Sequence, residues 1–440
     1  MELKEWQKPL AERQTKALKE GKAMLSACHT GSGKTYIACQ TIKDLGMPTL
    51  VVCPKVAISQ WRHVIGGMGC TSYVVDVVNP ERLVAGRNSY YDNDTGWDRF
   101  PFGQSGRGGA LLVFDEVHRG ASGPESKQTL MAARWCNRLH PLNKELLMSA
   151  TPFETPLKMR LIGYLMGFHR FETRSFYDWC RRNGCRPVRR PNGRTSLEFT
   201  HDATRAKAIM AGFRKDMGGR FMSITPDEIP DFPTETVETL LLDLGKRDHD
   251  ALVRAYEEMP EQIKSMSRDD MVKTLRLRQQ AEFCKMEVTA AEVVQKVSEG
   301  YSVFAMVNFT DARARLEGCL GDAGVPFANI YGGQPETERQ AGIGAFQANQ
   351  VHVMVGMASA CSVALSLHDE RHERPRVSYI SPGYSASEFA QGLGRIRRVG
   401  GTHATQFVTV AAGSVEERVG RAIERKMGNL SALVDGDFAR

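Results

Sequence analysis

Short apolar runs separated by longer amphipathic stretches recur in two parts of the chain. In the first part they span residues 23–27, 48–53, 73–78, 110–114 and 145–149. In the second part they span residues 301–307, 327–331, 351–355, 377–380 and 405–410. Runs of strand length alternating with segments of helix length are typical of a parallel sheet with helices on both faces. The pattern therefore predicts two α/β units.

The residues between these two parts differ in character. They begin with a helical pattern, pass through a basic stretch rich in Pro, Gly and Asn at 183–196, and return to a helical pattern over about 247–298. The segment DEIPDFP at 227–233 carries two prolines and is predicted to be a linker. We therefore divide the chain into a first unit (1–155), a helical and basic insertion (156–235), a helical lead-in (236–298) and a second unit (299–440).

Composition removes several classes of protein. Of 440 residues, 42% are hydrophobic and 25% charged, which is typical of a globular chain. The apolar runs are far shorter than the roughly 20 residues that span a bilayer, and the charged start MELKEWQK does not resemble a secretory signal. The ten cysteines form no CxxC pair or zinc spacing. We expect a cytoplasmic protein without membrane insertion or structural zinc.

Positive charge is concentrated in one window. The net charge is +7, and residues 180–207 hold eight basic residues against Glu198 and Asp202. The eight are Arg181, Arg182, Arg186, Arg189, Arg190, Arg194, Arg205 and Lys207. Such a segment indicates a polyanion partner, although composition fits a solvated loop equally well.

The segment HTGSGKT at 29–35 follows one apolar run and precedes a helical pattern. Glycines let backbone N–H groups turn around phosphate oxygens, and the next helix adds its positive end. The candidate nucleotide-binding residues are Thr30, Gly31, Ser32, Gly33, Lys34 and Thr35. Lys34 would reach the β- and γ-phosphates, and Thr35 would ligate magnesium. Cys28 stands where the strict pattern has glycine, which leaves a turn without nucleotide as an alternative.

A second motif, which is acidic, follows another apolar run. The sequence ALLVFDEVH at 110–118 ends a predicted strand with two adjacent carboxylates. Asp115 would hold Mg²⁺ through water, and Glu116 would orient and deprotonate the attacking water. A solvated strand end is the alternative for an isolated pair of this kind.

These motifs occur in the order found in superfamily-two helicases and translocases. HTGSGKT is followed by VVCPKVAISQW at 51–61, DEVH at 115–118, SATP at 149–152, VFAMVNF at 303–309 and QGLGRIRR at 391–398. The flanks SATPFETPLKMRLIGYL, TLRLRQQAEFCK and SVEERVGRAIERK are most similar to Swi/Snf-type DNA translocases and related phage-type helicases. The resemblance implies two tandem RecA-like parallel-sheet domains with helical and basic-loop insertions between them.

The resemblance also implies roles for further residues of the ATP site. Gln7 matches the glutamine that reads adenine, with Gln14 as the alternative, and His118, Ser149 and Thr151 match residues that couple the nucleotide to movement. Gln391, Arg395 and Arg398 match the last motif and would meet the γ-phosphate. Arg395 and Arg398, three residues apart, are expected to share a helical face, with Arg397 pointing elsewhere.

Nucleic-acid contacts are implied by the same resemblance and by the basic window. The implied residues are Pro54, Lys55, Arg82, Asn308, Phe309, Gly332, Gly333 and Ser359, and the window adds Arg186, Arg189, Arg190 and Arg194. The stretch ACSVALSL at 360–367 departs from the family, because Cys361, Ser362 and Ala364 replace glycines and Ser366 stands at the polar position.

Together these features predict an ATP- and Mg²⁺-dependent DNA helicase or translocase that acts on duplex, forked or branched DNA. An RNA helicase, an ATP-gated remodelling subunit that does not separate strands, and an unrelated P-loop NTPase remain alternatives. We expect a monomer from a bacterium or a phage-infected cell.

Overall fold

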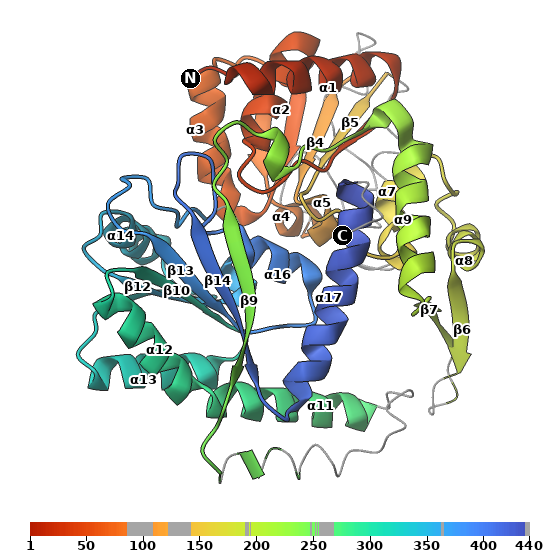
Figure 1. Cartoon of the computed structure of the whole chain (residues 1–440). Coiled ribbons are helices and arrows are strands. Elements are labelled where there is room, and N and C mark those ends of the chain that lie inside the picture. Colours follow the sequence, from red (N-terminus) through yellow and green to blue (C-terminus); the bar gives the residue numbers. More distant parts are fainter. Residues whose placement is uncertain are drawn as a thin grey trace. The chain divides into compact units, whose positions relative to one another are not determined.

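In the computed structural model the chain divides into two units (Figure 1). The structure describes residues 1–85, 109–121, 142–189, 193, 195–246, 249–250, 252, 254, 268–361 and 365–435. The first unit comprises Met1–Pro187, Leu197–Pro230 and Gly428–Arg440, and the second comprises Val188–Ser196 and Asp231–Met427. The change of unit between Pro230 and Asp231 falls inside the predicted linker at 227–233.

A parallel sheet of six strands forms the centre of the first unit, in the order β3-β2-β4-β5-β1-β8. The strands are β1 (Ala23–Ser26), β2 (Thr49–Val52), β3 (Val74–Val78), β4 (Leu111–Asp115), β5 (Lys144–Met148) and β8 (Phe221–Met222). The first five confirm the predicted strands to within two residues. The two-residue strand β8 was not predicted, because so short a run carries no periodicity.

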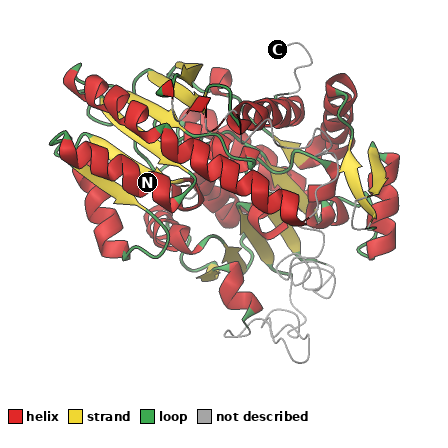
Figure 2. Ribbon diagram, turned by 90° about the horizontal axis from the view of Figure 1, so that it is seen from below, coloured by secondary structure: helices red, strands yellow, loops and turns green. Residues whose placement is uncertain are grey.

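The helices of the first unit follow in chain order; Figure 1 labels several of them, and Figure 2 draws the helices of the chain in red. They are η1 (Glu5–Gln7), α1 (Lys8–Glu20), α2 (Lys34–Leu45), η2 (Lys55–Ala57), α3 (Ile58–Met68), α4 (Pro80–Val84), α5 (Val117–Ala121), η3 (Pro156–Lys158), α7 (Arg160–Leu165), α8 (Thr173–Arg182), α9 (Ala203–Met217), η4 (Gly218–Arg220) and η5 (Pro226–Glu228). One hydrophobic core joins strand residues such as Leu25 and Leu112 to an aromatic group around Phe176, Trp179 and Phe213.

The second unit repeats the design with a parallel sheet in the order β11-β12-β10-β13-β14-β9. Its strands are β9 (Glu235–Leu242), β10 (Ser302–Val307), β11 (Phe327–Ile330), β12 (Val353–Met357), β13 (Arg376–Ile380) and β14 (Ala404–Ala411). Its helices are α11 (Arg268–Cys284), α12 (Met286–Ser298), α13 (Thr310–Asp322), α14 (Glu336–Gln347), α15 (Ala358–Cys361), α16 (Ala386–Leu393) and α17 (Val415–Val434). The five strands predicted here are confirmed.

Strand β9 lies where the sequence predicted the start of a helical segment. It pairs with β14 over its whole length at the edge of the sheet. Much of its surface faces solvent, with Val237 45% and Leu241 59% exposed. An edge strand of this kind shows no continuous buried run, which explains why the apolar pattern missed it.

A buried ion pair holds the first turn of α17 in the second unit. The Lys285 ammonium, fully buried between α11 and α12, lies 2.8 Å from both carboxylate oxygens of Glu416 and donates to the Thr409 carbonyl at 2.7 Å. Glu416 also accepts from the Ala411 N–H at 2.9 Å. The two sequence flanks TLRLRQQAEFCK and SVEERVGRAIERK therefore meet through this pair.

The last turns of α17 belong to the first unit. Ala432, Leu433 and Val434 lie in its hydrophobic core. The Asn429 amide donates to the Glu154 carbonyl at 3.2 Å, and both Arg214 and the Ser223 hydroxyl donate to the Val434 carbonyl. Donors at the end of a helix satisfy carbonyls that lack intrahelical partners.

In the described residues, no helix combines the length and the apolar character needed to cross a membrane.

Glu145 on β5 predicts a pH dependence of stability. Its side chain is fully buried, 3.7 Å from the Lys22 ammonium, and burial raises its pKa from an ordinary value near 4.5 to about 8. Between pH 4.5 and 8 the folded state therefore keeps a proton on Glu145 that the unfolded chain has lost. Stability should fall with rising pH in this window, by up to about 1.4 kcal/mol per pH unit.

Glu145→Gln is therefore expected to raise the melting temperature at pH 8 and to flatten its dependence on pH, measured by thermal unfolding from pH 5.5 to 8.5. Glu12→Gln, at an exposed position on α1, serves as the matched control. Parallel pH profiles for wild type and Glu145→Gln would contradict the prediction.

Candidate active site

The predicted ATP-site motifs meet at one edge of the first sheet. The phosphate loop follows β1, Asp115 ends β4, and Ser149 follows β5. These three strands are parallel neighbours, so their carboxyl ends lie at the same edge. Ligands of open α/β sheets bind at this edge.

The phosphate loop has the backbone that its glycines predict. Gly31 and Gly33 have φ values of 86° and 76°, and a Cβ on Gly33 would lie 2.4 Å from the Gln7 amide nitrogen. The Lys34 ammonium donates to the carbonyls of Cys28 and His29 at 3.0 and 3.3 Å. Cys28 is fully buried and has no positive φ, so this position does not require glycine.

Of the two candidate glutamines, Gln7 touches the phosphate loop. Its side-chain amide donates to the Ser32 carbonyl at 3.0 Å, and its carbonyl accepts from the Lys4 N–H at 3.0 Å. Gln14 donates instead to the Thr41 hydroxyl at 3.0 Å, a contact between α1 and α2. The geometry favours Gln7, and its adenine-reading role stays a prediction.

Two features of the loop fit a phosphate ligand. The Ser32 hydroxyl is buried and has no hydrogen-bond partner among the described residues. The left-handed glycines and the helix beginning at Lys34 direct backbone N–H groups into the loop. Thr35 would supply an oxygen ligand of the kind that Mg²⁺ prefers, and Asp115 would hold the ion through water.

Asp115 is held on both carboxylate oxygens. One accepts from the Trp61 indole N–H at 2.8 Å, and the other accepts from the Glu116 N–H at 3.0 Å. Burial, and next the neighbouring Glu116 carboxylate, raise the pKa of Asp115 to about 6, against the opposing effects of Trp61 and Lys34. Trp61 was not among the residues predicted from the sequence.

Glu116, His118, Ser149 and Thr151 form one hydrogen-bonded group. The His118 Nδ1 lies 2.7 Å from the Ser149 hydroxyl and 3.3 Å from the Glu116 carboxylate. The Ser149 hydroxyl also accepts from the Thr151 N–H at 3.0 Å. Burial lowers the pKa of His118 to about 3, so the ring is neutral at physiological pH. The structure thus brings the DEVH and SATP motifs together.

The predicted nucleic-acid contacts of the first unit also follow strands. Pro54 and Lys55 come after β2, and Arg82 lies on α4 after β3, with Lys55 and Arg82 exposed. Since β2 and β3 are parallel to β4, these residues lie along the edge that carries Asp115.

In the second unit, the predicted contacts follow β10 (Asn308, Phe309), β11 (Gly332, Gly333) and β12 (Ser359). Asn308 donates through its amide to the Glu282 carboxylate at 3.0 Å. The Arg278 guanidinium lies 5.4 Å from the centre of the Phe309 ring. Glu282 and Arg278, both on α11, support this edge and were not predicted, because their spacing from Asn308 is visible only in the fold.

The expectation that Arg395 and Arg398 share a helical face is wrong. Helix α16 ends at Leu393, and Gly394 follows as its cap. Arg395 is buried in a turn and donates to the Leu365 carbonyl at 3.0 Å. Arg397 does point elsewhere, as predicted, since it bonds the Pro233 carbonyl and Glu235. Gln391 is buried on α16 and Arg398 is partly exposed.

The basic window is not a simple loop. Residues Cys185–Arg189 and Thr195–Phe199 form strands β6 and β7 of a two-stranded sheet. Arg186 and Arg189 are exposed on β6, and their spacing of three places them on opposite faces. Arg190 and Arg194 lie outside the described residues, as do Ser362 and Ala364 of the divergent stretch, whereas Cys361 is buried and Ser366 is partly exposed.

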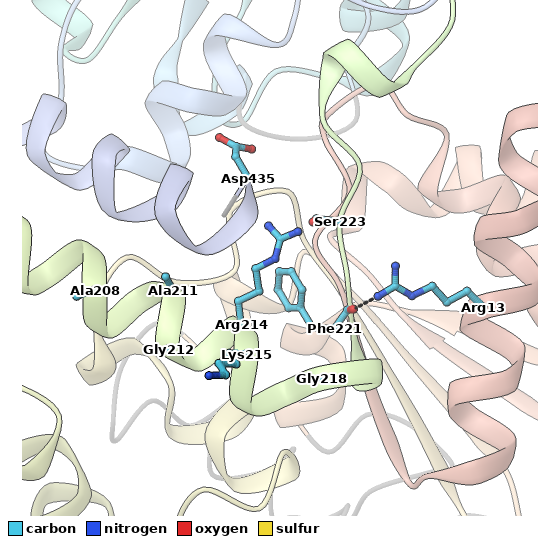
Figure 3. A pocket seen from close by; sticks show the side chains of 10 residues that line it. All are labelled: Arg13, Ala208, Ala211, Gly212, Arg214, Lys215, Gly218, Phe221, Ser223 and Asp435. Carbon is cyan, nitrogen blue, oxygen red and sulfur yellow. Dashed lines mark hydrogen bonds between the residues drawn. The ribbon is translucent and has the colours of Figure 1, made fainter. Parts of the chain in front are cut away.

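A pocket of about 600 Å³ lies apart from the ATP-site residues in the first unit (Figure 3). Its lining residues are Arg13, Ala208, Ala211, Gly212, Arg214, Lys215, Gly218, Phe221, Ser223 and Asp435. Arg13 donates to the Phe221 carbonyl at 3.0 Å, and Arg214 and Ser223 hold the end of α17. Arg13, Arg214 and Ser223 thus bond to other parts of the same unit.

Comparison with known proteins agrees with the motifs and the fold. The family model described as "Type III restriction enzyme, res subunit" matches residues 1–154. A protein of Acanthamoeba polyphaga mimivirus named "Putative ATP-dependent RNA helicase" is 28% identical over 455 residues, which cover 94% of this chain and 80% of that protein. The structure of S. cerevisiae Dbp5 bound to RNA and ADP BeF3 matches with a TM-score of 0.51 and 12% identity, over 95% of this chain and 87% of that chain.

The chain has two RecA-like parallel-sheet units, a fold that it shares with the Dbp5 structure.

Proposed function

We propose that this chain is a superfamily-two enzyme, a DNA helicase or translocase that uses ATP and Mg²⁺ to move on or remodel duplex, forked or branched DNA. The observation that carries the proposal is the hydrogen-bonded group formed by Glu116, His118, Ser149 and Thr151. It connects the residue that would activate water to the segment after β5. A motor protein needs a connection of this kind to couple ATP hydrolysis to a conformational change.

The proposed roles follow from chemistry and position. Lys34 would neutralise the β- and γ-phosphates. Thr35 would ligate Mg²⁺ and Asp115 would hold it through water, while Glu116 would orient and deprotonate the attacking water. The metal, when bound, draws charge from the phosphate oxygens. Gln7 would read adenine. Gln391, Arg395 and Arg398 would stabilise the charge that develops on the γ-phosphate.

We propose that ATP binds in a cleft between two RecA-like domains (1–155 and 299–440), which are separated in the chain by a helical and basic insertion (156–235) and a helical lead-in (236–298). Alternating grip by the two units would give directed movement along a strand. The proposed contacts in the first unit are Pro54, Lys55 and Arg82. In the second they are Asn308, Phe309, Gly332, Gly333 and Ser359, and all eight follow the carboxyl ends of strands.

An RNA helicase is the second candidate. It is favoured by the name of the mimivirus relative and by the RNA in the Dbp5 structure. The resemblance of the flanks to Swi/Snf-type translocases favours DNA. Phosphate contacts alone carry no information on the sugar or the base.

The deciding experiment compares ATP turnover with no nucleic acid, single-stranded DNA, duplex, fork, four-way junction and RNA, together with strand displacement on the same substrates. The proposal expects stimulation that is strongest with duplex, forked or branched DNA. Stimulation by RNA alone would establish the second candidate, and equal turnover on every substrate would contradict both.

The basic window should bind DNA phosphates. Arg186→Ala combined with Arg189→Ala is expected to weaken DNA binding and to reduce the slope of log K against log salt by about 0.9 for each phosphate that is no longer neutralised. DNA-independent ATP turnover should change little, because neither residue belongs to an ATP-site motif. Fluorescence anisotropy at several salt concentrations measures the effect.

The matched control is the pair Lys16→Ala and Lys19→Ala, which removes two exposed charges from α1. If the arginine pair leaves both affinity and salt slope at the wild-type values, β6 makes no contact with DNA. Adding Arg190→Ala and Arg194→Ala extends the test to all four arginines of the window that are proposed to contact phosphates.

A further inference from the structure

The Trp61 indole is a buried donor aimed at the proposed metal-binding carboxylate. Trp61 lies on α3, is 1% exposed, and donates to one Asp115 oxygen at 2.8 Å. The indole N–H can only donate, so the pairing has a fixed direction. A hydrogen bond to a charged carboxylate is stronger than one between neutral groups.

Trp61 and the Glu116 backbone hold the Asp115 carboxylate from two directions. The Glu116 N–H occupies the other oxygen at 3.0 Å. With both oxygens engaged, rotation of the carboxylate would break a hydrogen bond in a partly buried site, at a cost of about 1 kcal/mol. Since the backbone bond is made by the neighbouring residue in the chain, Trp61 is the partner that comes from a different element.

The helix that carries Trp61 begins next to a proposed nucleic-acid contact. Pro54 precedes η2 (Lys55–Ala57), and α3 starts directly after it at Ile58. Lys55 is exposed, whereas Trp61, six residues later, is buried against Asp115. One short segment, η2 and the start of α3, therefore presents a cation at the surface and an indole at the carboxylate.

We propose that Trp61 is a positioning residue that orients Asp115 toward Mg²⁺ and couples nucleic-acid contact at Lys55 to the metal site. The metal part rests on Asp115 as the residue that would hold the metal through water, and the coupling part rests on the proposed function. Binding of a nucleic-acid backbone phosphate at Lys55 would stabilise the positions of η2 and α3. Trp61 would then hold the Asp115 carboxylate in the orientation that the metal requires. Nucleic acid would thereby raise ATP turnover without contacting the nucleotide.

The first test measures metal binding without turnover or nucleic acid. Mn²⁺ binding in the presence of a non-hydrolysable ATP analogue is followed by electron paramagnetic resonance. Trp61→Phe keeps an aromatic ring and removes the donor, and it should weaken Mn²⁺ binding by about 10-fold or more. Trp179→Phe, which makes the same change within the buried aromatic group on α8, is the matched control and should match wild type.

The second test measures coupling. Stimulation of ATP turnover by nucleic acid is compared for wild type, Trp61→Phe, Lys55→Ala and the double variant. If the two residues are coupled, the double variant should be stimulated by nucleic acid almost as much as the single variant that shows the lower stimulation. Both changes would then interrupt the same connection. Reductions that multiply in the double variant would overturn the coupling.

The outcomes separate the two proposals. Wild-type Mn²⁺ affinity in a folded Trp61→Phe protein, with folding checked by circular dichroism, would overturn the positioning role. If wild type binds Mn²⁺ and nucleotide but no nucleic acid stimulates it, the proposed function and the coupling both fail, while the positioning result stands on its own.

Discussion

Replacing Lys34 with alanine is expected to abolish ATP turnover, with a reduction of about 10³-fold or more. The Lys34 ammonium lies on the carbonyls of Cys28 and His29 inside the phosphate loop. No other side chain of HTGSGKT carries a permanent positive charge that could neutralise the β- and γ-phosphates. Steady-state phosphate release, with nucleic acid present and absent, measures the effect.

Lys43→Ala provides the matched control, because Lys43 is an exposed lysine in the last turn of the same helix α2. It should turn over ATP like wild type. A folded Lys34→Ala protein that keeps most of its turnover would refute the assignment of the phosphate loop.

Glu116→Gln should separate nucleotide binding from hydrolysis. The amide keeps the size of the side chain and its contact with the Ser149 hydroxyl, which lies 3.5 Å from the carboxylate, but it cannot take a proton from water. We expect ATP and Mg²⁺ to bind with near-wild-type affinity while hydrolysis falls by about 10²–10⁴-fold. Calorimetric binding of a non-hydrolysable analogue and single-turnover hydrolysis measure the two quantities.

Glu20→Gln is the control, since its exposed carboxylate lies 3.9 Å from Lys16 at the end of α1. An equal reduction of nucleotide affinity in Glu116→Gln would instead make Glu116 a metal ligand or a structural residue. Glu116 has a φ of 51°, in the left-handed region that a glutamate rarely adopts. The fold therefore maintains a costly backbone conformation at the residue proposed to activate water.

The sequence predicted the parts of the fold that have a strong local signal. The strand runs before Lys34 and Asp115 are buried on both faces, so they appear as continuous apolar segments. The exposed edge strand β9 and the polar strands β6 and β7 give no such signal. The end of α16 was missed because spacing alone does not reveal that Gly394 caps the helix before Arg395.

The candidate site was predicted where motif order fixes residue roles, and missed where long-range contacts assign them. Lys34, Asp115 and Glu116 come from short motifs. The choice of Gln7 over Gln14 needed the hydrogen bond to Ser32. Trp61 stands 54 positions before Asp115, and a tryptophan on an amphipathic helix is ordinarily a core residue. Only its indole nitrogen distinguishes this one.

The docking of the α17 end has a consequence for biosynthesis. The first unit completes its core with Ala432, Leu433 and Val434, and the contact between Arg214 and Val434 joins residues 220 positions apart. During synthesis the N-terminal portion emerges from the ribosome long before these residues do, and domains generally fold as units during synthesis. The nascent first unit therefore exposes an apolar surface until the second unit has been translated. A fragment ending before Gly428 would leave that surface exposed, where it can bind chaperones or aggregate.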